Sequence, residues 1–414
     1  MKILYLTFYF DPDLCAGSFR NTALVKALAH QLNRDDFIHV VTTQPNRYKS
    51  FQVTAPVREE RTYESGARVL IERIAVPSHA SGLMDQIRSF WSYYQTARQL
   101  TRKRSYDLVV ASSSRLFTAF LGAQVARRQN ATLFLDIRDL CRETILEMVK
   151  RGRKLTPLLR FGLEPVLAAV EQYAFSYASH INLVSEGFKP YFESFRHATY
   201  SYFTNGIDDE FLALSWSTVS AEKPANTTIK RILYAGNIGQ GQGLHTIIPE
   251  AARRLGPTFQ FVVIGDGGAK LLLEKVLREE RITNVALLDP VGRNELVDHY
   301  KAADYLFVHL NDLDAFKRVL PSKLFDYGAT DKPILAGVAG YAAQFIRQHI
   351  SNCIVFDPGD ADSLVTQLHT TPYSSGFRPD FIAQFQRKAI MQAMARQIIQ
   401  TKLASTDYIK PIAI

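Results

Sequence analysis

Short apolar runs alternate with longer amphipathic stretches along almost the whole chain of 414 residues. The apolar runs predict strands, and the amphipathic stretches predict helices. Regular alternation of this kind is typical of a parallel sheet that is covered by helices on both faces. In the first half of the chain, the predicted strands are residues 2–10, 39–43, 69–76, 107–112 and 177–185, with a further strand beginning at residue 132. The pattern therefore predicts an α/β fold.

The alternation restarts after a polar stretch, residues 215–230, which contains Pro224 and is typical of a linker. The next predicted strands are residues 232–235, 259–264, 285–288 and 304–310, and residues 380–401 form one long amphipathic helix. The length suits two domains. The predicted division is an N-terminal domain at 1–211, a linker at 212–230, a second domain at 231–379 and a C-terminal helical segment at 380–414 that crosses back to the first domain.

The compartment is predicted from the residues after the first apolar run and from the cysteines. Asp11, Pro12 and Asp13 come directly after the opening run, which indicates a buried strand rather than a secretory signal. No run approaches the ~18–20 apolar residues of a membrane-spanning helix. The three cysteines are far apart and lack metal-ligand spacing. We therefore expect a protein of the reducing cytoplasm.

Residues 316–340 contain the most informative motif, PSKLFDY. Pro321 presets a turn, and Ser322 stands where the N-cap of a helix is expected. A helix N-terminus binds phosphate through free N–H groups and a partial positive charge. Asp326 follows Ser322 by about one helical turn, where its carboxylate could accept hydrogen bonds from ribose hydroxyls. The alternative is an ordinary capped helix with a surface aspartate.

A glycine loop follows the first strand of the second domain. Residues 236–243 contain four glycines and are followed by a predicted helix. Main-chain N–H groups of such a loop can surround a phosphate, although turns also use glycine. A smaller loop in the first domain carries Gly17, where a ligand could approach the backbone, and Arg20, which could reach a phosphate or simply be a solvated surface residue.

Charged residues also cluster at the end of the strand that begins at residue 132. Arg138 and Asp139 follow it directly, and charges at the tip of an interior strand are costly unless they face a cleft. We expect both to line a cleft, where Asp139 could orient or deprotonate a hydroxyl group of a substrate. The alternative is a buried Arg–Asp ion pair that holds the loop.

PSKLFDY followed by KPILA, together with GNIG and its Gln-Gly pair, resembles the donor site of glycosyltransferase family 4, in its bacterial polysaccharide-assembly branch. The resemblance implies the GT-B architecture of two Rossmann-like domains facing each other across a cleft. It also implies retention of anomeric configuration, a UDP-sugar donor, and no metal or other cofactor. The donor-binding residues that it implies are Gly17, Arg20, Asn237, Gln242, Val291, Arg318, Ser322, Lys323 and Asp326.

The sequence departs from the family pattern at the donor site. The family carries two acids separated by seven residues, and Arg318 occupies the first position, for which Asp312 or Asp314 is a candidate substitute. Asn237 and Gln242 stand where most members have Arg and Lys. The two amides would then hydrogen-bond the phosphates, while Lys323 or Arg318 supplies positive charge.

The net charge of +9 indicates a polyanionic partner, which could be nucleic acid, anionic lipid or a diphosphate-bearing substrate. Basic and apolar residues are interleaved at residues 87–104 and 142–171. Such stretches suit a helix on an anionic membrane, single-stranded nucleic acid, or an ordinary surface helix.

The predicted function is that of a hexosyltransferase. It would move an N-acetylated hexosamine from a UDP-sugar to a glycan acceptor, such as one linked to polyprenyl diphosphate, at the cytoplasmic face of the membrane. Its products would be O-antigen, lipopolysaccharide or capsule, and no nucleic acid is expected as a partner. Three alternatives stay open: a UDP-sugar epimerase of GT-B fold, a nucleic-acid-binding protein, and a catalytically degenerate binder.

Overall fold

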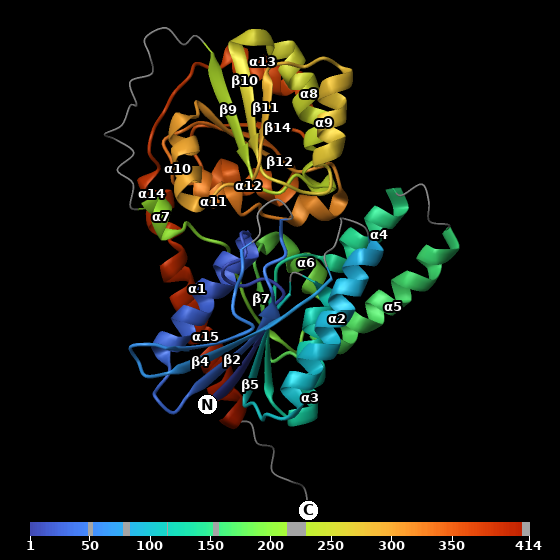
Figure 1. Ribbon diagram of the computed structural model, residues 1–414, viewed down its shortest axis with the longest axis vertical. Coiled ribbons are helices and arrows are strands. Elements are labelled where there is room, and N and C mark those ends of the chain that lie inside the picture. Colours follow the sequence, from blue (N-terminus) through green and yellow to red (C-terminus); the bar gives the residue numbers. More distant parts are fainter. Residues whose placement is uncertain (49–52, 78–82, 114, 152–156, 213–228, 408–414) are drawn as a thin grey trace, which may run out of the picture. The chain divides into compact units, whose positions relative to one another are not determined.

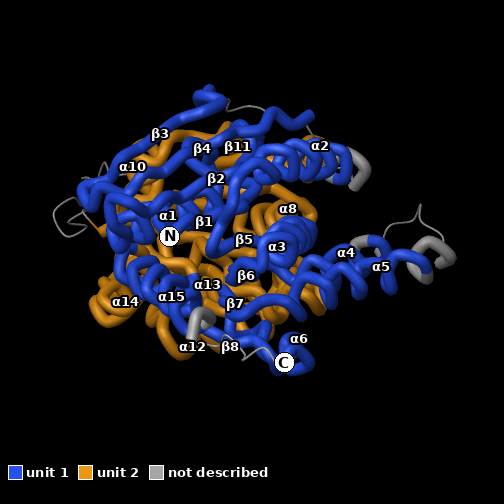
Figure 2. The backbone as a smooth tube through the Cα atoms, turned by 90° about the horizontal axis from the view of Figure 1, so that it is seen from below, with its two compact units in different colours: residues 1–47, 53–204, 388–414 blue, residues 48–52, 205–387 orange. Residues whose placement is uncertain are grey.

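The computed structural model describes residues 1–48, 53–77, 83–113, 115–151, 157–212 and 229–407 (Figure 1). The chain divides into two compact units. Unit 1 comprises residues 1–47, 53–204 and 388–414, and unit 2 comprises residues 48–52 and 205–387 (Figure 2). Most of the predicted linker, residues 213–228, lies outside the described residues.

Unit 1 is built on an eight-stranded sheet with the order β3-β4-β2-β1-β5-β6-β7-β8. Its strands are β1 (Lys2–Leu6), β2 (Phe37–Thr43), β3 (Arg58–Thr62), β4 (Arg68–Ile74), β5 (Leu108–Ser113), β6 (Thr132–Ile137), β7 (His180–Leu183) and β8 (Thr199–Ser201). All neighbours pair in parallel except β3 and β4, which are antiparallel. The helices are α1 (Ala16–Gln31), α2 (Leu83–Arg102), α3 (Leu116–Gln129), α4 (Cys141–Arg151), α5 (Pro157–Phe175), α6 (Lys189–Phe192) and α15 (Arg387–Asp407).

The C-terminal helix α15 is part of the core of unit 1. Met391, Met394 and Ile398 are fully buried, in one cluster with Leu24 and Leu28 of α1 and with side chains of β1 and β2. Their apolar surface gives about 1.5–3 kcal/mol of stabilisation for each fully buried large side chain. Helix α15 is therefore held by the same core as β1 and α1.

Unit 2 has a six-stranded parallel sheet with the order β11-β10-β9-β12-β13-β14. Its strands are β9 (Lys230–Ala235), β10 (Phe259–Ile264), β11 (Val285–Leu288), β12 (Tyr305–His309), β13 (Ile334–Gly337) and β14 (Cys353–Phe356). Its helices are α7 (Asp209–Leu212), α8 (Leu244–Leu255), α9 (Lys270–Glu279), α10 (Arg293–Ala302), α11 (Lys323–Gly328), α12 (Gly340–His349), α13 (Ala361–Thr370) and α14 (Pro379–Gln384). The expected α/β fold with two parallel-sheet domains is confirmed.

Each sheet reverses its strand order once, and the reversal fixes where a ligand can bind. In unit 2 the chain runs outward from β9 to β11 and then returns to β12 on the other side of β9. In unit 1 the corresponding reversal lies between β1 and β5. Loops that leave neighbouring strands in opposite directions open a crevice at the carboxyl edge of a parallel sheet, and ligands bind there.

Some predicted elements differ in the structure. Strands β3 and β8 were missed because they are short and polar, and the first strand ends at Leu6 rather than Phe10. The predicted continuous helix 380–401 is wrong, because α14 and α15 are separate helices. Between them, the backbone N–H of Ile207 donates to the Phe385 carbonyl, and Arg387 donates to Ile207. These strand-like bonds replace the helical ones.

Candidate functional site

The glycine loop of unit 2 lies at the strand reversal, directly after β9. Gly236 has a φ of +139° and Gly243 a φ of +60°, both in the region that favours glycine. A Cβ atom on Gly236 would come within 2.5 Å of Nζ of Lys323, whose ammonium also lies 4.9 Å from the centre of the Tyr234 ring. The fold therefore brings one predicted donor-binding cation, Lys323, against the glycine loop.

The amides of Asn237 and Gln242 bind each other. Nδ2 of Asn237 donates to Oε1 of Gln242 at 2.8 Å, and the backbone N–H of Gly239 donates to the same oxygen at 3.1 Å. These bonds hold the shape of the loop. Within the described part of the chain, Nε2 of Gln242 donates to no partner, so it is the group of this pair that is left to bind a ligand.

Ser322 precedes α11 as predicted but does not cap it. Its φ and ψ of −60° and −28° are already helical, and its side chain makes no capping hydrogen bond. An N-cap side chain reaches the N–H groups of the first turn from an extended backbone, which Ser322 lacks. The capping prediction for Ser322 is therefore wrong, and α11 is only six residues long.

Asp326 lies in a buried cluster of charges within unit 2. Its Oδ1 atom is buried and accepts no hydrogen bond. Burial raises the pKa of Asp326 to about 7, and the nearby carboxylate of Asp208 adds to the increase, while Arg293, Arg387 and Lys323 oppose it. A buried acceptor without a donor costs about 1–3 kcal/mol, which an incoming hydroxyl could recover.

The other members of this cluster come from distant parts of the chain. Asp208 accepts hydrogen bonds from Arg387 and, at 2.6 Å, from Nη2 of Arg293. Arg293 begins α10, two residues after Val291, which is half-buried. Two predicted donor-binding residues are thus connected through Arg293, which follows Val291 by two positions and interacts electrostatically with Asp326.

The segment between β12 and α11 borders the glycine loop. The Phe316 ring lies against Gly241, where a Cβ atom would approach it to 2.9 Å. Arg318 is half-buried at the end of the short 3-10 helix Asp314–Arg318. Asp312 and Asp314, the candidate substitutes for the first family acid, are exposed. The segment that carries Arg318 therefore contacts the glycine loop through Phe316.

In unit 1, Gly17, Arg138 and Asp139 meet at the carboxyl edge of the sheet. A Cβ atom on Gly17 would lie 2.5 Å from Nη1 of Arg138, whose Nε is buried without a partner. Although Asp139 is exposed as a residue, desolvation of its carboxyl group by the surrounding protein raises its pKa to about 6, and the charges of Arg138 and Arg47 oppose the increase. No ion pair joins Arg138 and Asp139 within the residues described, so the alternative of a buried pair between them does not hold.

Arg20 is not available to a phosphate. Its side chain is fully buried, and Nε and Nη2 donate to both carboxylate oxygens of Asp136 at 3.0 and 2.9 Å. Further bonds go to the carbonyl oxygens of Phe203 and Thr204. The predicted donor contact of Arg20 is therefore wrong, because its guanidinium joins β6 to the residues that follow β8.

Several charged residues near these sites were missed in the sequence. Asp208 ends the sequence Asn-Gly-Ile-Asp, which is typical of a turn and does not by itself indicate a buried charge. Arg47 and Arg115 lie near Tyr9, with Arg115 4.1 Å above the Phe8 ring. Nothing in the local sequence marks these arginines, because their partners come from other loops. Among the described residues, no three His, Cys, Asp or Glu side chains group as a metal site.

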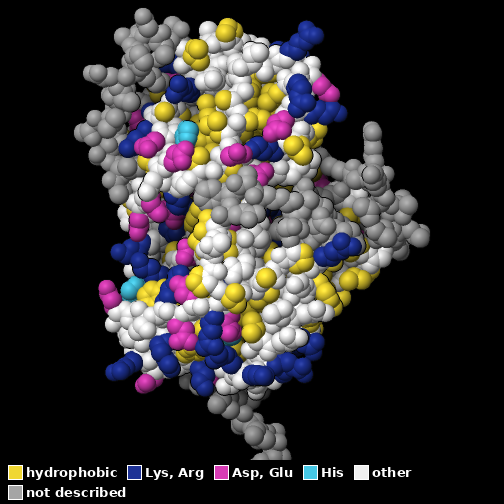
Figure 3. All heavy atoms as spheres, in the orientation of Figure 1, with side chains coloured by type: hydrophobic (Ala, Val, Ile, Leu, Met, Phe, Trp, Pro, Cys, Tyr) yellow, Lys and Arg dark blue, Asp and Glu magenta, His cyan; other side chains and the backbone are white. Residues whose placement is uncertain are grey.

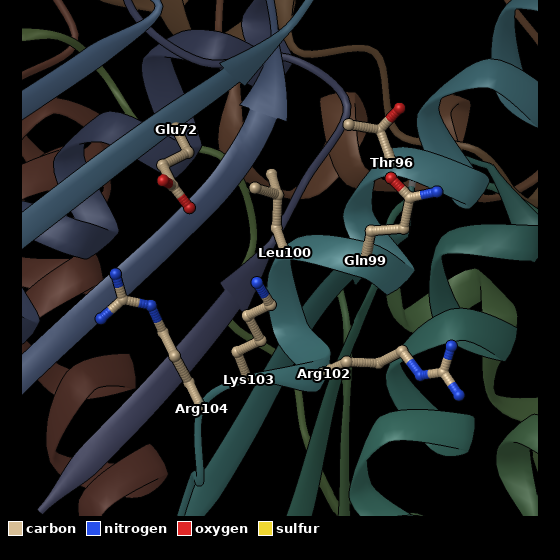
Figure 4. Close-up of a pocket in the computed structure, with 7 residues that line it drawn as sticks. All are labelled: Glu72, Thr96, Gln99, Leu100, Arg102, Lys103 and Arg104. Carbon is tan, nitrogen blue, oxygen red and sulfur yellow. The ribbon is translucent and has the colours of Figure 1, made fainter.

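Basic side chains also gather at the lower edge of unit 1 in the view of Figure 3. At the end of α2, a cavity of about 810 Å³ is lined by Glu72, Leu100, Arg102, Lys103 and Arg104, among others. Lys103 and Arg104 extend toward Glu72, whereas Arg102 extends to the other side (Figure 4). No helix in the described ranges has the length and apolar character to cross a membrane.

Comparison with known proteins gives matches at the level of sequence and of fold. Residues 217–371 match the family model described as "Glycosyl transferases group 1". The putative colanic acid biosynthesis glycosyl transferase WcaI of Escherichia coli is 36% identical over 95 residues, which is 23% of this chain and 23% of that protein. The alignment with this curated relative thus spans less than a quarter of its length.

Solved structures match over nearly the whole chain. Anabaena Alr3699/HepE in complex with UDP and glucose matches with a TM-score of 0.56 and 16% identity, covering 100% of both chains. The α,α-trehalose 6-phosphate synthase of Burkholderia multivorans matches with a TM-score of 0.66 and 10% identity, covering 100% of this chain and 99% of that one. Residues 217–371 are thus similar to the group 1 glycosyl transferases, and the whole chain has the GT-B fold of these structures.

Proposed function

We propose that this protein is a glycosyltransferase that takes a sugar from a UDP-sugar donor. One observation carries the proposal: the strand reversal of unit 2 brings the glycine loop, Lys323 and the segment leading to Asp326 to one edge of the sheet. These are the parts that a nucleotide diphosphate needs, namely N–H donors, a cation and a carboxylate for ribose. The HepE structure, which contains UDP and glucose, supports the same ligand class.

The residues of unit 2 would stabilise the departing UDP. Lys323 and the loop N–H groups would take up the negative charge that develops on the diphosphate, and Nε2 of Gln242 would add a hydrogen bond. Arg318 is the second candidate cation. Asp326 would accept hydrogen bonds from the ribose. Because these residues would stabilise the charge, the transfer would need no metal. The transferred sugar would keep its anomeric configuration.

The residues of unit 1 would act on the acceptor. Asp139, with a pKa near 6, is mostly ionised at neutral pH and can accept a proton from a hydroxyl group. Arg138 lies against Gly17 with an unused Nε, so it can orient an anionic or hydroxyl group of a substrate. We assign Asp139 the role of orienting or deprotonating the acceptor and Arg138 the role of positioning it.

For the substrates, we propose an N-acetylated hexosamine as the donor sugar and a glycan carried on polyprenyl diphosphate as the acceptor. The family resemblance and the named role of WcaI in colanic acid biosynthesis support an envelope polysaccharide, such as O-antigen or capsule, as the product. Synthesis would take place at the cytoplasmic face of the membrane.

The exposed face of α2 suits contact with that membrane. Ile87 and Trp91 are exposed to 50% and 58%, and the exposed arginines Arg98 and Arg102 follow on the same helical stripe. Apolar and aromatic side chains beside basic ones favour an anionic lipid surface. Most of the basic cluster at residues 150–160 lies outside the residues whose side chains are described.

Calorimetric titration with a panel of nucleotide sugars tests the donor proposal. We expect binding of UDP and at least one UDP-sugar, and slow hydrolysis rather than epimer formation when donor is incubated alone. Failure of every uridine nucleotide to bind would refute the proposal. For the membrane, reversing Arg98 and Arg102 to Glu should reduce pelleting with anionic liposomes, and unchanged pelleting would remove α2 as the contact.

A further inference from the structure

A second cavity in unit 1 lies among α4, α5 and the turn that follows α6. Its volume is about 420 Å³, within the range of small-molecule sites. Arg142 of α4 lines it, together with Ala169, Glu171 and Gln172 of α5 and Tyr191 and Ser194 of the α6 region. We call this cavity the α5 groove. None of the residues that we propose to bind the donor or the acceptor lines the groove.

The chemistry of the α5 groove fits a sugar ring better than a phosphate. A guanidinium, a carboxylate, a carboxamide and a hydroxyl provide both hydrogen-bond donors and acceptors, as sugar hydroxyls require. The phenol ring of Tyr191 supplies an apolar surface. The single cation, Arg142, is balanced by Glu171 at 3.5 Å and Glu164 at 3.5 Å, so the groove has no excess positive charge for a phosphate.

The polar groups of the groove are held in place before any ligand binds. The Tyr191 hydroxyl donates a hydrogen bond to the carboxylate of Glu171, a residue that is only 3% exposed. Burial raises the pKa of Glu171, while the Tyr191 hydrogen bond and the Arg142 charge oppose the increase. A buried carboxylate is costly unless it is satisfied by such partners. Preorganised groups of this kind lower the cost of binding.

The groove adjoins the acceptor residue Asp139. Glu171 and Tyr191 also line a small cavity of about 10 Å³, which is lined on another side by Asp139 and Cys141. A volume of that size can hold about one water molecule. Glu171 and Tyr191 thus belong both to the lining of the α5 groove and to that of the small cavity that reaches Asp139, the residue that we assign to the acceptor hydroxyl.

We propose that the α5 groove binds an uncharged sugar ring of the acceptor next to the ring that reacts. The acceptor is then a saccharide longer than one residue, held by Arg142, Gln172, Tyr191 and Ser194 through its hydroxyls. This inference rests on the proposed glycosyltransferase function and adds a substrate class and a set of binding residues to it.

Filling the groove tests the proposal. Ala169 is exposed on α5 and lines the groove, so Ala169→Trp should block it without changing the core. Val166, exposed to 56% on the same helix and outside the lining, gives the matched control Val166→Trp. The probes are methyl glycosides of glucose, galactose, N-acetylglucosamine and N-acetylgalactosamine, observed by saturation-transfer NMR with UDP present.

We expect at least one glycoside to receive saturation from the wild type and from Val166→Trp, and the signal to be lost in Ala169→Trp. If Ala169→Trp does not fold, Gln172→Ala serves instead and should weaken the signal, with Gln95→Ala on α2 as its control. Absence of any glycoside signal in the wild type, or a signal that survives in the groove variants, overturns the inference. UDP affinity is measured in every variant. If UDP binds normally while these results appear, the inference about the groove fails and the donor proposal does not.

Discussion

Replacing Asp326 with Asn tests the link between the buried charge cluster and donor binding. The substitution keeps the shape of the side chain and removes its charge. Hydrogen bonds to a charged acceptor contribute about 1.5–3 kcal/mol, which corresponds to about 10- to 150-fold in affinity. We therefore expect UDP to bind Asp326→Asn more weakly than the wild type by a factor in this range at about pH 8, where the wild-type carboxylate is mostly ionised.

The pH dependence gives the sharper result. With a pKa of about 7, Asp326 is about nine-tenths ionised at pH 8 and about one-tenth ionised at pH 6. If the ionised form binds ribose, the apparent Kd of the wild type rises by up to about tenfold over this interval. The UDP affinity of Asp326→Asn should not show this change, because Asn does not ionise. The UDP affinities of the two proteins should therefore converge as the pH falls.

Calorimetric titration of UDP at several pH values measures both effects. UDP itself titrates with a pKa of about 6, so the wild type and the variant are compared with each other at each pH. Asp298→Asn, on the exposed face of α10, is the matched control and should bind like the wild type. Equal UDP affinity of wild type and Asp326→Asn at the higher pH, or a pH profile that the substitution leaves unchanged, would refute the reasoning.

Three further predictions concern unit 1. Arg20→Met leaves the buried carboxylate of Asp136 without its ion pair, so urea unfolding should show a loss of about 3–5 kcal/mol, and a smaller loss in the double variant with Asp136→Asn. Gly17→Ala should displace the Arg138 guanidinium and lower transfer up to about a hundredfold, with UDP affinity and thermal stability unchanged; unaltered transfer would show that Arg138 does not position substrate. The transfer rate should fall as pH drops below about 6, because Asp139 becomes protonated, and Asp139→Asn should lower the rate strongly and remove this pH dependence from the activity that remains.

The donor site was predictable where its signal is local. Glycines between strand and helix mark the loop because the backbone there adopts positive φ values, as Gly236 and Gly243 show. PSKLFDY marks the start of α11 for a similar reason, since proline and the residues after it restrict the backbone locally. The cap at Ser322 was nevertheless mispredicted, because its helical backbone depends on how the preceding loop packs.

The roles of charged residues were less predictable. Arg20 was expected at a phosphate and instead pairs with Asp136, which lies 116 positions away. Asp208 and Arg387 form a hydrogen-bonded pair across 179 positions. A cation near the start of a helix has the same local sequence whether it faces a ligand or a buried carboxylate, so only the folded chain distinguishes the two cases.

The sequence by itself determined the two βα domains, the glycine loop and the segment that carries Lys323 and Asp326, because periodicity and backbone restriction act over a few residues. The tertiary structure alone decided which charges are buried together, as at Arg20 and Asp208, and that α5 borders a groove beside Asp139. These features depend on the burial of groups from distant segments, and the free energy of a charge is set by the partners that burial brings to it.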